Sequence, residues 1–395
     1  MKIVHLTTSM SGGAGIAARR ICQSQNEYGM DSSILGGQIS EKSVLRRNES
    51  IHYRNPKQKI SSSFVTYLQS SLVQRGELLT TPISISTIDL DDSRIQEADI
   101  LNIHAFYNLL SNQKIAQIAQ NKRVVVTLHD QRFFTGGCHY SFGCNQYEST
   151  CTKCPQVMKS ARSIVRKAHN QELANRQVLE AVSYVTPSNW LRNMALKSSL
   201  LKNSNIEVIN NPIPNDFKKI NGSTKSDRFT IGFVSENLNN PYKGVSTLIE
   251  AVNAMSRNRK ISLLLFGSGS VSGLEPGVDL EYSRFDTDAE SAMSFNKCDV
   301  IVIPSVQDNS PSVLSESLMC GIPVVASQVG GITEILSQFG LPGFPPRDFR
   351  KLADLLEFMA STRPEFPLLA NADKFLSYSA CAPKYQAVYE RAVSQ

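Results

Sequence analysis

The stretch PSVQDNSPSVLSESLMCGIPVVASQVGGITEI, residues 304–335, decides the fold class of this 395-residue chain. It begins where an apolar run, Val300 to Pro304, ends. Ser310 is then placed to cap a helix whose first position is Pro311. A glycine ends that helix before a second apolar run, Pro323 to Ser327. Strand, helix and strand in this order predict parallel strands joined by a crossover helix.

The same alternation of short apolar runs and helix-period segments continues through the whole chain. The runs are apolar on both faces, which is typical of central strands covered by helices on both sides. They are predicted at Lys2 to Thr7, Ser33 to Gly36, Ile100 to His104, Val124 to His129, Tyr184 to Pro187 and Ile206 to Ile209, and then at Thr230 to Val234, Ile261 to Phe266, Val300 to Pro304 and Pro323 to Ser327. We therefore predict an α/β protein with two parallel sheets.

The two halves are expected to join just after residue 210. The segment Asn210 to Asn215 contains prolines and asparagines, which interrupt regular structure. The predicted domains are residues 1–210 and 211–374, followed by a C-terminal helix over 375–395. The length of the chain agrees with two domains.

Composition and charge exclude several classes of protein. Hydrophobic residues are 41% and charged residues 19%, as in an ordinary globular chain. No apolar run approaches the ~20 residues that cross a bilayer, and Met1 to Thr8 lacks the apolar segment of a secretory signal, so we expect a cytoplasmic protein. The net charge of +6 is concentrated in residues 1–210, which suggests an anionic partner. No nucleic-acid module accompanies that charge, so nucleic acid is not expected.

A glycine-rich turn follows the first predicted strand. Ser11 to Gly15 reads SGGAG and opens a helical run that extends to Tyr28. Backbone amides at such a turn can approach a phosphate, so Gly12 and Gly13 are predicted to bind a donor. The turn is not the G-x-G-x-x-G fingerprint, which disfavours a nicotinamide-dependent oxidoreductase. A tight turn without a ligand is the alternative.

Two carboxylates, Asp308 and Glu316, stand eight residues apart around the predicted helix start. The acids can bind hydroxyl groups while backbone amides face a phosphate. Those amides belong to Asn309, Ser310, Pro311 and Ser312, of which the proline supplies only its helix-start position. Without the flanking motif, a capping acid and a solvated helix acid would be the default interpretation.

The pattern around these acids resembles the family 4 retaining glycosyltransferases of the GT-B class. Asp308-x7-Glu316 is followed by GIPVV at 321–325 and GGITE at 330–334, which match the family's E-x7-E, G-x-P-V-V and G-G-x-x-E elements. The resemblance implies two Rossmann-like domains that face a cleft, with the sugar donor held by the second. It also implies that Asp308 contacts the donor sugar and Glu316 the ribose. Asp308 departs from the usual Glu.

Two further segments carry the same resemblance. In GFVSENLNNPYKG, Lys243 takes the place of the lysine that contacts the donor diphosphate, while Asn237 and Asn240 stand where the family commonly has Arg. In VVVTLHDQRFF, His129 takes the place of the histidine near the sugar and acceptor. His104, at the end of the preceding strand, is the second candidate and is assigned to the acceptor side. A structural histidine is the alternative for each.

The resemblance implies transfer of a hexose from a nucleoside diphosphate sugar, with UDP or GDP, to a saccharide or lipid-linked saccharide in glycan assembly. No divalent-cation motif such as D-x-D stands where the donor site needs one, so no cofactor is expected for catalysis. Two rivals remain: a sugar-nucleotide epimerase on the same fold, and an inactive sugar-nucleotide-binding partner.

Four of the eight cysteines lie within seventeen residues, at Cys138, Cys144, Cys151 and Cys154. In a reducing compartment such a cluster, ending in C-x-x-C, favours a structural zinc site over disulfides, with His139 able to replace one thiol. The spacing is not a standard zinc-ribbon pattern, so free thiols are the alternative. The insertion 138–154 is similar to a Cys-rich element of some polysaccharide-assembling relatives.

Two further helices are predicted in the first half. A basic helical face is predicted from Lys159, Arg162, Arg166 and Lys167. Such a face can lie against anionic lipid at the inner side of a membrane, and a solvated face is the alternative. An amphipathic helix is predicted from Ile60, Phe64, Leu68 and Leu72, which recur at every fourth position.

Overall fold

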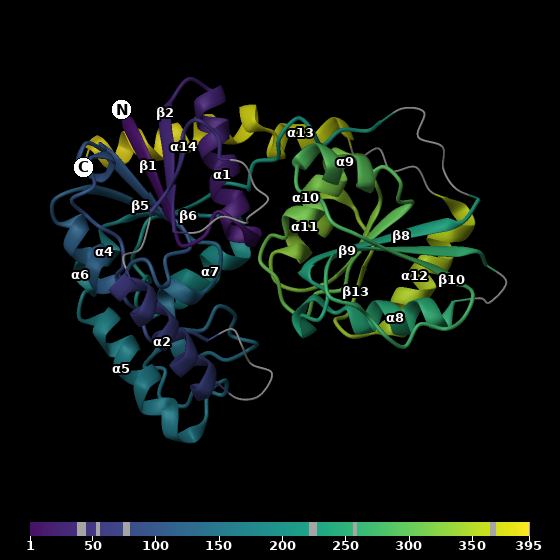
Figure 1. Ribbon diagram of the computed structural model, residues 1–395, viewed down its shortest axis with the longest axis horizontal. Coiled ribbons are helices and arrows are strands. Elements are labelled where there is room, and N and C mark those ends of the chain that lie inside the picture. The colour runs from purple at the N-terminus through teal and green to yellow at the C-terminus, as the bar shows by residue number, and fades with distance from the viewer. Residues whose placement is uncertain are drawn as a thin grey trace. The chain divides into compact units, whose positions relative to one another are not determined.

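The computed structural model describes residues 1–37, 45–52, 56–73, 80–220, 227–255, 259–363 and 369–394. It divides the chain into two compact units, each with its own parallel sheet (Figure 1). The first unit contains Met1–Asn210 and Cys381–Gln395, and the second contains Asn211–Ala380. The C-terminal helix is α14 (Tyr378–Ser394), so it begins in the second unit and belongs to the first from Cys381 onward.

The first unit is built on a seven-stranded sheet with the order β3-β2-β1-β4-β5-β6-β7. Its strand pairs are all parallel, which requires helical crossovers between them. The strands are β1 (Lys2–Thr7), β2 (Asp31–Gly36), β3 (Glu49–Ile51), β4 (Ile100–Ile103), β5 (Arg123–Thr127), β6 (Ser183–Thr186) and β7 (Ile206–Val208).

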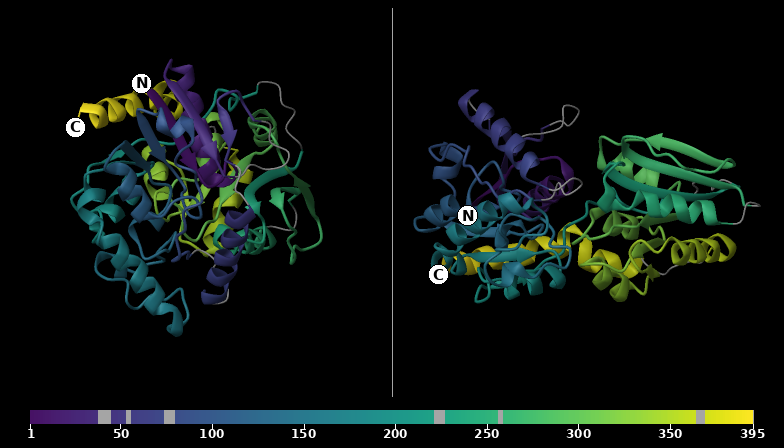
Figure 2. Two further views of the ribbon diagram at one scale, coloured as in Figure 1. Left: turned by 60° about the vertical axis from the view of Figure 1, so that its left-hand side comes forward. Right: turned by 90° about the horizontal axis from the view of Figure 1, so that it is seen from below.

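Helices cover both faces of this sheet. They are α1 (Gly12–Glu27), α2 (Pro56–Leu72), α3 (Ser93–Gln96), α4 (Asn112–Ala119), α5 (Arg162–Leu173), α6 (Arg176–Glu180) and α7 (Asn189–Lys197). The final part of α14 lies along the strands on one face, as both views in Figure 2 show. There Tyr385 and Tyr389 are fully buried among aliphatic residues such as Ile3, Ile100 and Val125. Burial of two aromatic rings anchors α14 to the first unit.

The second unit is built on a six-stranded parallel sheet with the order β10-β9-β8-β11-β12-β13. Its strands are β8 (Phe229–Asn237), β9 (Ile261–Ser268), β10 (Val278–Ser283), β11 (Val300–Ile303), β12 (Val324–Ser327) and β13 (Gly343–Phe344). Its helices are α8 (Val245–Ala254), α9 (Asp288–Phe295), α10 (Ser312–Met319), α11 (Ile332–Phe339), α12 (Phe349–Thr362) and α13 (Leu369–Leu376). Two apolar clusters, one on each face of the sheet, form its core.

The structure contains every strand that the sequence predicts, and adds β3, β10 and β13 at the sheet edges. The predicted helix is present as α2, but not all four of its predicted apolar positions face the core. Ile60 is 71% exposed and Phe64 59% exposed, whereas Val65 faces the core. A repeat of exactly four residues drifts by about 40° per step on a helix of 3.6 residues per turn, so the four positions spread over about 120°. Only Leu68 and Leu72, at one end of this arc, are partly buried.

Among the described residues, no helix combines the length and apolarity that a membrane crossing requires.

Candidate functional site

The strand order of the second sheet reverses between β8 and β11. The chain continues from β8 to β9 and β10 on one side, while β11, β12 and β13 extend the sheet on the other. In open parallel sheets, ligands bind outside the carboxyl ends of the strands at such a reversal. The segment after β8 carries Lys243, and the segment after β11 carries Asp308. The two predicted donor residues therefore lie at the position where this fold binds ligands.

Lys243 and Asp308 form an ion pair across this reversal. Nζ of Lys243 lies 2.7 Å from Oδ2 of Asp308. Oδ1 of the buried carboxylate accepts the backbone N–H of Asn309 at 2.9 Å, and the Ser305 hydroxyl donates to Oδ2 at 3.3 Å. The lysine side chain is 36% exposed. A firmly hydrogen-bonded carboxylate thus holds an ammonium group that solvent, and hence a ligand, can reach.

Two glycines bring the neighbouring turns against the segment that carries Asp308. Gly244 has φ +74°, and a Cβ there would lie 2.0 Å from the carbonyl oxygen of Pro304. Gly330 has φ +52°, and a Cβ there would lie 1.9 Å from the carbonyl oxygen of Asp308. A side chain at either position would push the turns apart. This contact explains why glycines stand directly after Lys243 and in the GGITE element.

Helix α10 begins at Ser312, one residue later than predicted. Pro311 has an extended ψ of 122°, and its carbonyl accepts the N–H of Leu314 at 3.0 Å, which makes Pro311 the N-cap. The prediction of Ser310 as the N-cap and Pro311 as the first helical residue is therefore wrong. Glu316 is buried in the middle of α10, as the fifth of its eight residues. Asp308, the helix start and Glu316 thus follow the carboxyl end of β11.

The asparagines that replace the family's arginine shape the turn before Lys243. Oδ1 of Asn240 accepts the N–H of Tyr242 at 3.0 Å and caps the short 3-10 turn Pro241–Lys243. Oδ1 of Asn237 accepts the N–H of Asn239 at 2.9 Å. Both side chains accept hydrogen bonds from the backbone of the loop. Lys243 is the cation that this turn contributes to the site.

The first sheet reverses its order between β1 and β4, and the glycine turn lies there. Helix α1 begins at Gly12, with Ser11 as its N-cap and no acidic residue in its first turn. Gly13 is exposed, and a Cβ added to it would meet no atom within 4 Å. The start of α1 therefore presents the positive end of the helix dipole without a neighbouring carboxylate.

Three histidines form a row across the adjacent strands β1, β4 and β5. Nδ1 of His5 lies 2.8 Å from Nε2 of His104, and Nδ1 of His104 lies 3.0 Å from Nε2 of His129. The neighbouring rings stack, with centroids 5.0 and 5.3 Å apart. Burial lowers the pKa of His5 and that of His129 to about 4, and the pKa of His104 well below its usual range. All three rings are therefore neutral at pH 7.

Further polar side chains surround the His129 end of this row. Nδ1 of His139 lies 2.6 Å from Oδ2 of Asp130, and its Nε2 lies 3.1 Å from the Thr81 hydroxyl. Arg132 donates from Nε to the same hydroxyl at 3.0 Å. His129, Asp130, Arg132 and His139 line a cavity of about 20 Å³, which has room for about one water molecule.

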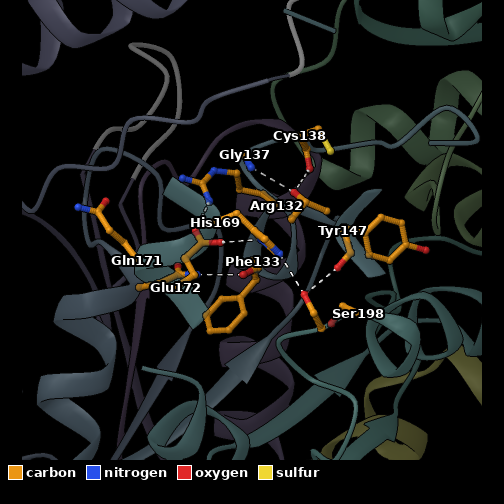
Figure 3. Close-up of polar contacts among 12 residues, drawn as sticks. Arg132, Phe133, Gly137, Cys138, Tyr147, His169, Gln171, Glu172 and Ser198 are labelled. Atoms are coloured by element: carbon orange, nitrogen blue, oxygen red, sulfur yellow. Dashed lines mark hydrogen bonds and ion pairs between the residues drawn. The ribbon is translucent and has the colours of Figure 1, made fainter. Parts of the chain in front are cut away.

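Arg132 is fixed by a buried carboxylate. One of its guanidinium nitrogens lies 3.4 Å from Oε1 of Glu172, and Oε2 of Glu172 lies 3.9 Å from Nδ1 of His169 (Figure 3). Both Arg132 and Glu172 are almost fully buried. Burial raises the pKa of the Glu172 carboxyl to about 8, although Arg132 acts in the opposite direction. The pair ties α5 to the loop that follows His129.

Replacing Glu172 should separate a structural from an electrostatic contribution. Glu172→Gln should not lower the free energy of unfolding at pH 7 and is expected to raise it, because an amide resembles the protonated carboxyl of the folded state and needs no proton on folding. Glu172→Ala should cost about 2–4 kcal/mol, because it strips Arg132 of a buried partner and leaves a cavity. Urea unfolding measures both values. Equal losses in the two variants would contradict this account of the pair.

The four clustered cysteines surround one small cavity of about 20 Å³, together with Tyr147 and Gln156. All four are free thiols, and burial raises the pKa of Cys151 to about 12 and that of Cys154 above its usual range. The structure therefore brings the four residues together. Within the described residues, however, no three His, Cys, Asp or Glu side chains lie in an arrangement ready to hold a metal ion. The zinc site stays a prediction.

Comparison with protein families finds a similarity in the second half of the chain. Residues 228–361 match the family model of glycosyl transferases group 1. This match lies within the second unit. The chain is also similar to the colanic acid biosynthesis glycosyl transferase WcaC of Escherichia coli K12, with 27% identity over 254 residues. That alignment covers 60% of this chain and 61% of WcaC, so the chain spans about three fifths of this relative.

Solved structures match both units of the chain. Sucrose-phosphate synthase from Thermosynechococcus elongatus aligns over 100% of both chains, with a TM-score of 0.68 and 14% identity. HepE of Anabaena, solved with UDP and glucose, aligns over 99% of this chain and 100% of its own, with a TM-score of 0.67 and 15% identity. The chain has the GT-B fold.

Several residues at these positions are absent from the sequence prediction. Asp130 and Arg132 could have been found, because they directly follow His129 at the end of a predicted strand. His5 and Gln25 had no such signal. His5 lies inside an apolar strand and Gln25 inside a helix, and only the tertiary fold joins them to His104.

Proposed function

We propose that this protein is a retaining glycosyltransferase that moves a hexose from a nucleoside diphosphate sugar to a saccharide or lipid-linked saccharide. The observation that carries the proposal is the Lys243–Asp308 pair at the chain reversal of the unit that matches glycosyl transferases group 1. UDP is the nucleotide we favour, because HepE has been solved with UDP-glucose. Similarity to a colanic acid biosynthesis enzyme supports glycan assembly as the setting.

Lys243 is proposed to stabilise the leaving diphosphate. Departure of a nucleoside diphosphate concentrates negative charge on its terminal phosphate, and a cation fixed there stabilises the transition state more than the ground state. In the structure Asp308 holds the ammonium group in place. The amides at the start of α10 are proposed to add to the positive field around the phosphate. Asp308 and Glu316 are proposed to contact donor hydroxyl groups.

The residues of the first unit are proposed to act on the sugar and acceptor. His129 is proposed to lie near the sugar and the acceptor, and Nδ1 of His104 lies 3.0 Å from its Nε2. The exposed Gly12–Gly13 turn is proposed to approach the donor phosphates with its backbone. No step of this reaction requires a protein nucleophile, because the incoming hydroxyl attacks the anomeric carbon while the diphosphate leaves and takes its proton. Catalysis then rests on positioning and charge stabilisation.

A panel of donors tests the proposal against its rivals. Purified protein is incubated with UDP- and GDP-hexoses, and released nucleoside diphosphate is measured with and without oligosaccharide or lipid-linked acceptors. A transferase releases nucleotide in an acceptor-dependent manner. An epimerase converts the sugar and releases none, and an inactive binding partner changes no donor. Either of the last two results would refute transfer.

We also propose that the four-cysteine cluster binds one structural zinc ion. Four thiols around one cavity offer the sulfur ligands that zinc prefers, and the metal would deprotonate them despite their raised pKa values. Protein purified under reducing conditions should contain about one zinc per chain by elemental analysis. Cys144→Ser should lower that content strongly, whereas Cys22→Ala, outside the cluster, should not. Four free thiols with no zinc would contradict the proposal.

Contact with a membrane surface is proposed for the first unit. Ile60, Phe64 and Tyr67 of α2 are 71%, 59% and 69% exposed, and α5 carries the predicted basic face. The chain just after α2 pairs with the chain just before α5, through the bridge between Val73 and Val157. Apolar side chains beside basic residues are typical of interfacial helices. An acceptor linked to lipid would be reached from this surface.

Vesicle sedimentation tests this contact. Phe64→Ser should weaken binding to vesicles that contain anionic phospholipid by about tenfold or more, because burial of one Phe contributes about 1.5–3 kcal/mol. Phe358→Ser is the matched control, since Phe358 is 56% exposed on α12 of the second unit. Equal binding of both variants, or none by the wild type, would contradict the contact.

A further inference from the structure

The row of three histidines ends in the protein interior at an oriented amide. Nε2 of His5 lies 2.9 Å from Oε1 of Gln25 and 3.0 Å from the Ser32 hydroxyl. The Ser32 hydroxyl donates its own hydrogen to Oε1 of Gln25 at 2.9 Å. On its other side, Nε2 of Gln25 donates to the Tyr389 hydroxyl at 2.9 Å. Gln25 therefore presents an oxygen, and not an N–H group, to His5.

A second amide holds this end of the row in place. Nδ2 of Asn102 donates to the same Tyr389 hydroxyl at 2.7 Å, and the hydroxyl of Thr127 donates to Oδ1 of Asn102 at 2.9 Å. Every one of these side chains is buried. They come from α14, β4 and β5, so the orientation of Gln25 depends on contacts that span the whole first unit.

The acceptor at Gln25 determines where each histidine carries its proton. His5 must donate from Nε2, so its Nδ1 is an acceptor and receives the N–H of His104 Nε2. Nδ1 of His104 is then an acceptor in turn and receives the N–H of His129 Nε2. A neutral imidazole has one donor and one acceptor nitrogen. The acceptor oxygen of Gln25 therefore sets the tautomer of His5, and through it the tautomers of His104 and His129.

We propose that Gln25, His5 and His104 are positioning residues that hold His129 in the Nε2–H tautomer, with its Nδ1 as a hydrogen-bond acceptor. This inference rests on the proposed function and gives His129 a specific part in it. His5 and His104 are fully buried, whereas His129 is partly exposed, so the row leads from a sealed end to an accessible one.

The tautomer limits what His129 can bind. A neutral ring with an acceptor Nδ1 receives a hydrogen bond from a hydroxyl group, which sugars supply. Phosphate oxygens only accept hydrogen bonds, so the same nitrogen disfavours the diphosphate of the donor. His129 is thereby assigned to a hydroxyl of the donor sugar or of the acceptor, while Lys243 serves the phosphates.

Nuclear magnetic resonance reads the tautomers without any substrate. The chain has six histidines, so protein labelled with 15N-histidine gives a tractable long-range 1H–15N spectrum at pH 7. Resonances are assigned with His5→Asn, His104→Asn and His129→Asn. We expect all three rings to be neutral, with protonated Nε2 and acceptor-type Nδ1. A protonated Nδ1 on His129, or a charged ring, would overturn the inference and leave the proposed transfer reaction untouched.

A near-isosteric variant tests the role of Gln25. Gln25→Met removes the acceptor and keeps the side-chain volume, so His5 and His129 should show a mixture of both tautomers. With UDP-glucose as donor, kcat for UDP release should fall about 10- to 100-fold, as for other residues that orient a binding group, while KM for the donor changes less. Gln23→Met, on the same helix, should change neither readout. Unchanged tautomers in Gln25→Met would refute the orienting role whatever the activity.

Discussion

Lys243→Ala should lower the turnover of the sugar donor by about 100- to 1,000-fold, while the affinity for the donor falls far less. Removing one preorganised group that stabilises developing charge has this effect in other enzymes. Lys243 lies 2.7 Å from the buried Asp308, so its ammonium group is held before any ligand arrives. Initial rates of nucleotide release at several donor concentrations give kcat and KM separately.

A matched control keeps this result specific. Lys260 is also a lysine of the second unit that pairs with an aspartate, since its Nζ lies 2.7 Å from Oδ2 of Asp227. It lies at the start of β9, away from the carboxyl end of the sheet. Lys260→Ala should keep wild-type kinetics. A Lys243→Ala enzyme that is folded and fully active would remove this residue from the reaction.

The buried histidines should make the protein less stable as the pH falls from 7 to 5. The folded-state pKa of His5 and of His129 is about 4, whereas an unfolded histidine has a pKa near 6.5. The unfolded chain therefore binds more protons in this window, so the free energy of unfolding decreases as the pH is lowered. Each of these two histidines should remove about 2 kcal/mol between pH 7 and pH 5, and His104 acts in the same direction.

Glu172 opposes this trend and provides the way to isolate it. Its pKa is raised to about 8, so its contribution to stability is largest at low pH and is lost as the pH rises through 8. Glu172→Gln removes that contribution, and the loss of stability from pH 7 to pH 5 should then become steeper. Urea unfolding at four pH values measures the slope. A flat profile in Glu172→Gln would contradict neutral, buried histidines.

The sheets follow from the sequence because their central strands are continuous apolar runs. β3, β10 and β13 were missed for a physical reason. β10 alternates exposed and half-buried residues at a sheet edge, and β13 is only two residues long. β10 therefore has no buried face, and β13 is too short to show a hydrophobic pattern. Ile60 and Phe64 of α2 are exposed because a four-residue repeat drifts around a helix.

Some residues of the candidate site could likewise be predicted from the sequence, and others could not. Lys243, Asp308 and Glu316 could be named because they stand in linear motifs that resemble those of a known family. Lys243 and Asp308 follow neighbouring strands of one sheet. Gln25 and His5 could not be named, because their hydrogen-bond partners lie far away in the sequence. The bond from Gln25 to Tyr389 joins residues 364 positions apart. A sequence motif indicates which residues are candidates to bind a ligand. It does not indicate which buried residues orient those ligand-binding residues.

Titration calorimetry with nucleotide tests the central claim most directly, namely that the end of the second sheet holds a nucleoside diphosphate sugar. UDP, GDP and UDP-glucose are titrated into wild-type protein and into Glu316→Gln, which removes one buried charge and keeps the shape of the side chain. We predict binding of one of these nucleotides at one site per chain, and an affinity at least about tenfold weaker in Glu316→Gln, the loss of one charged hydrogen bond. Equal affinity in both proteins, or no binding of any nucleotide to the wild type, would contradict the account.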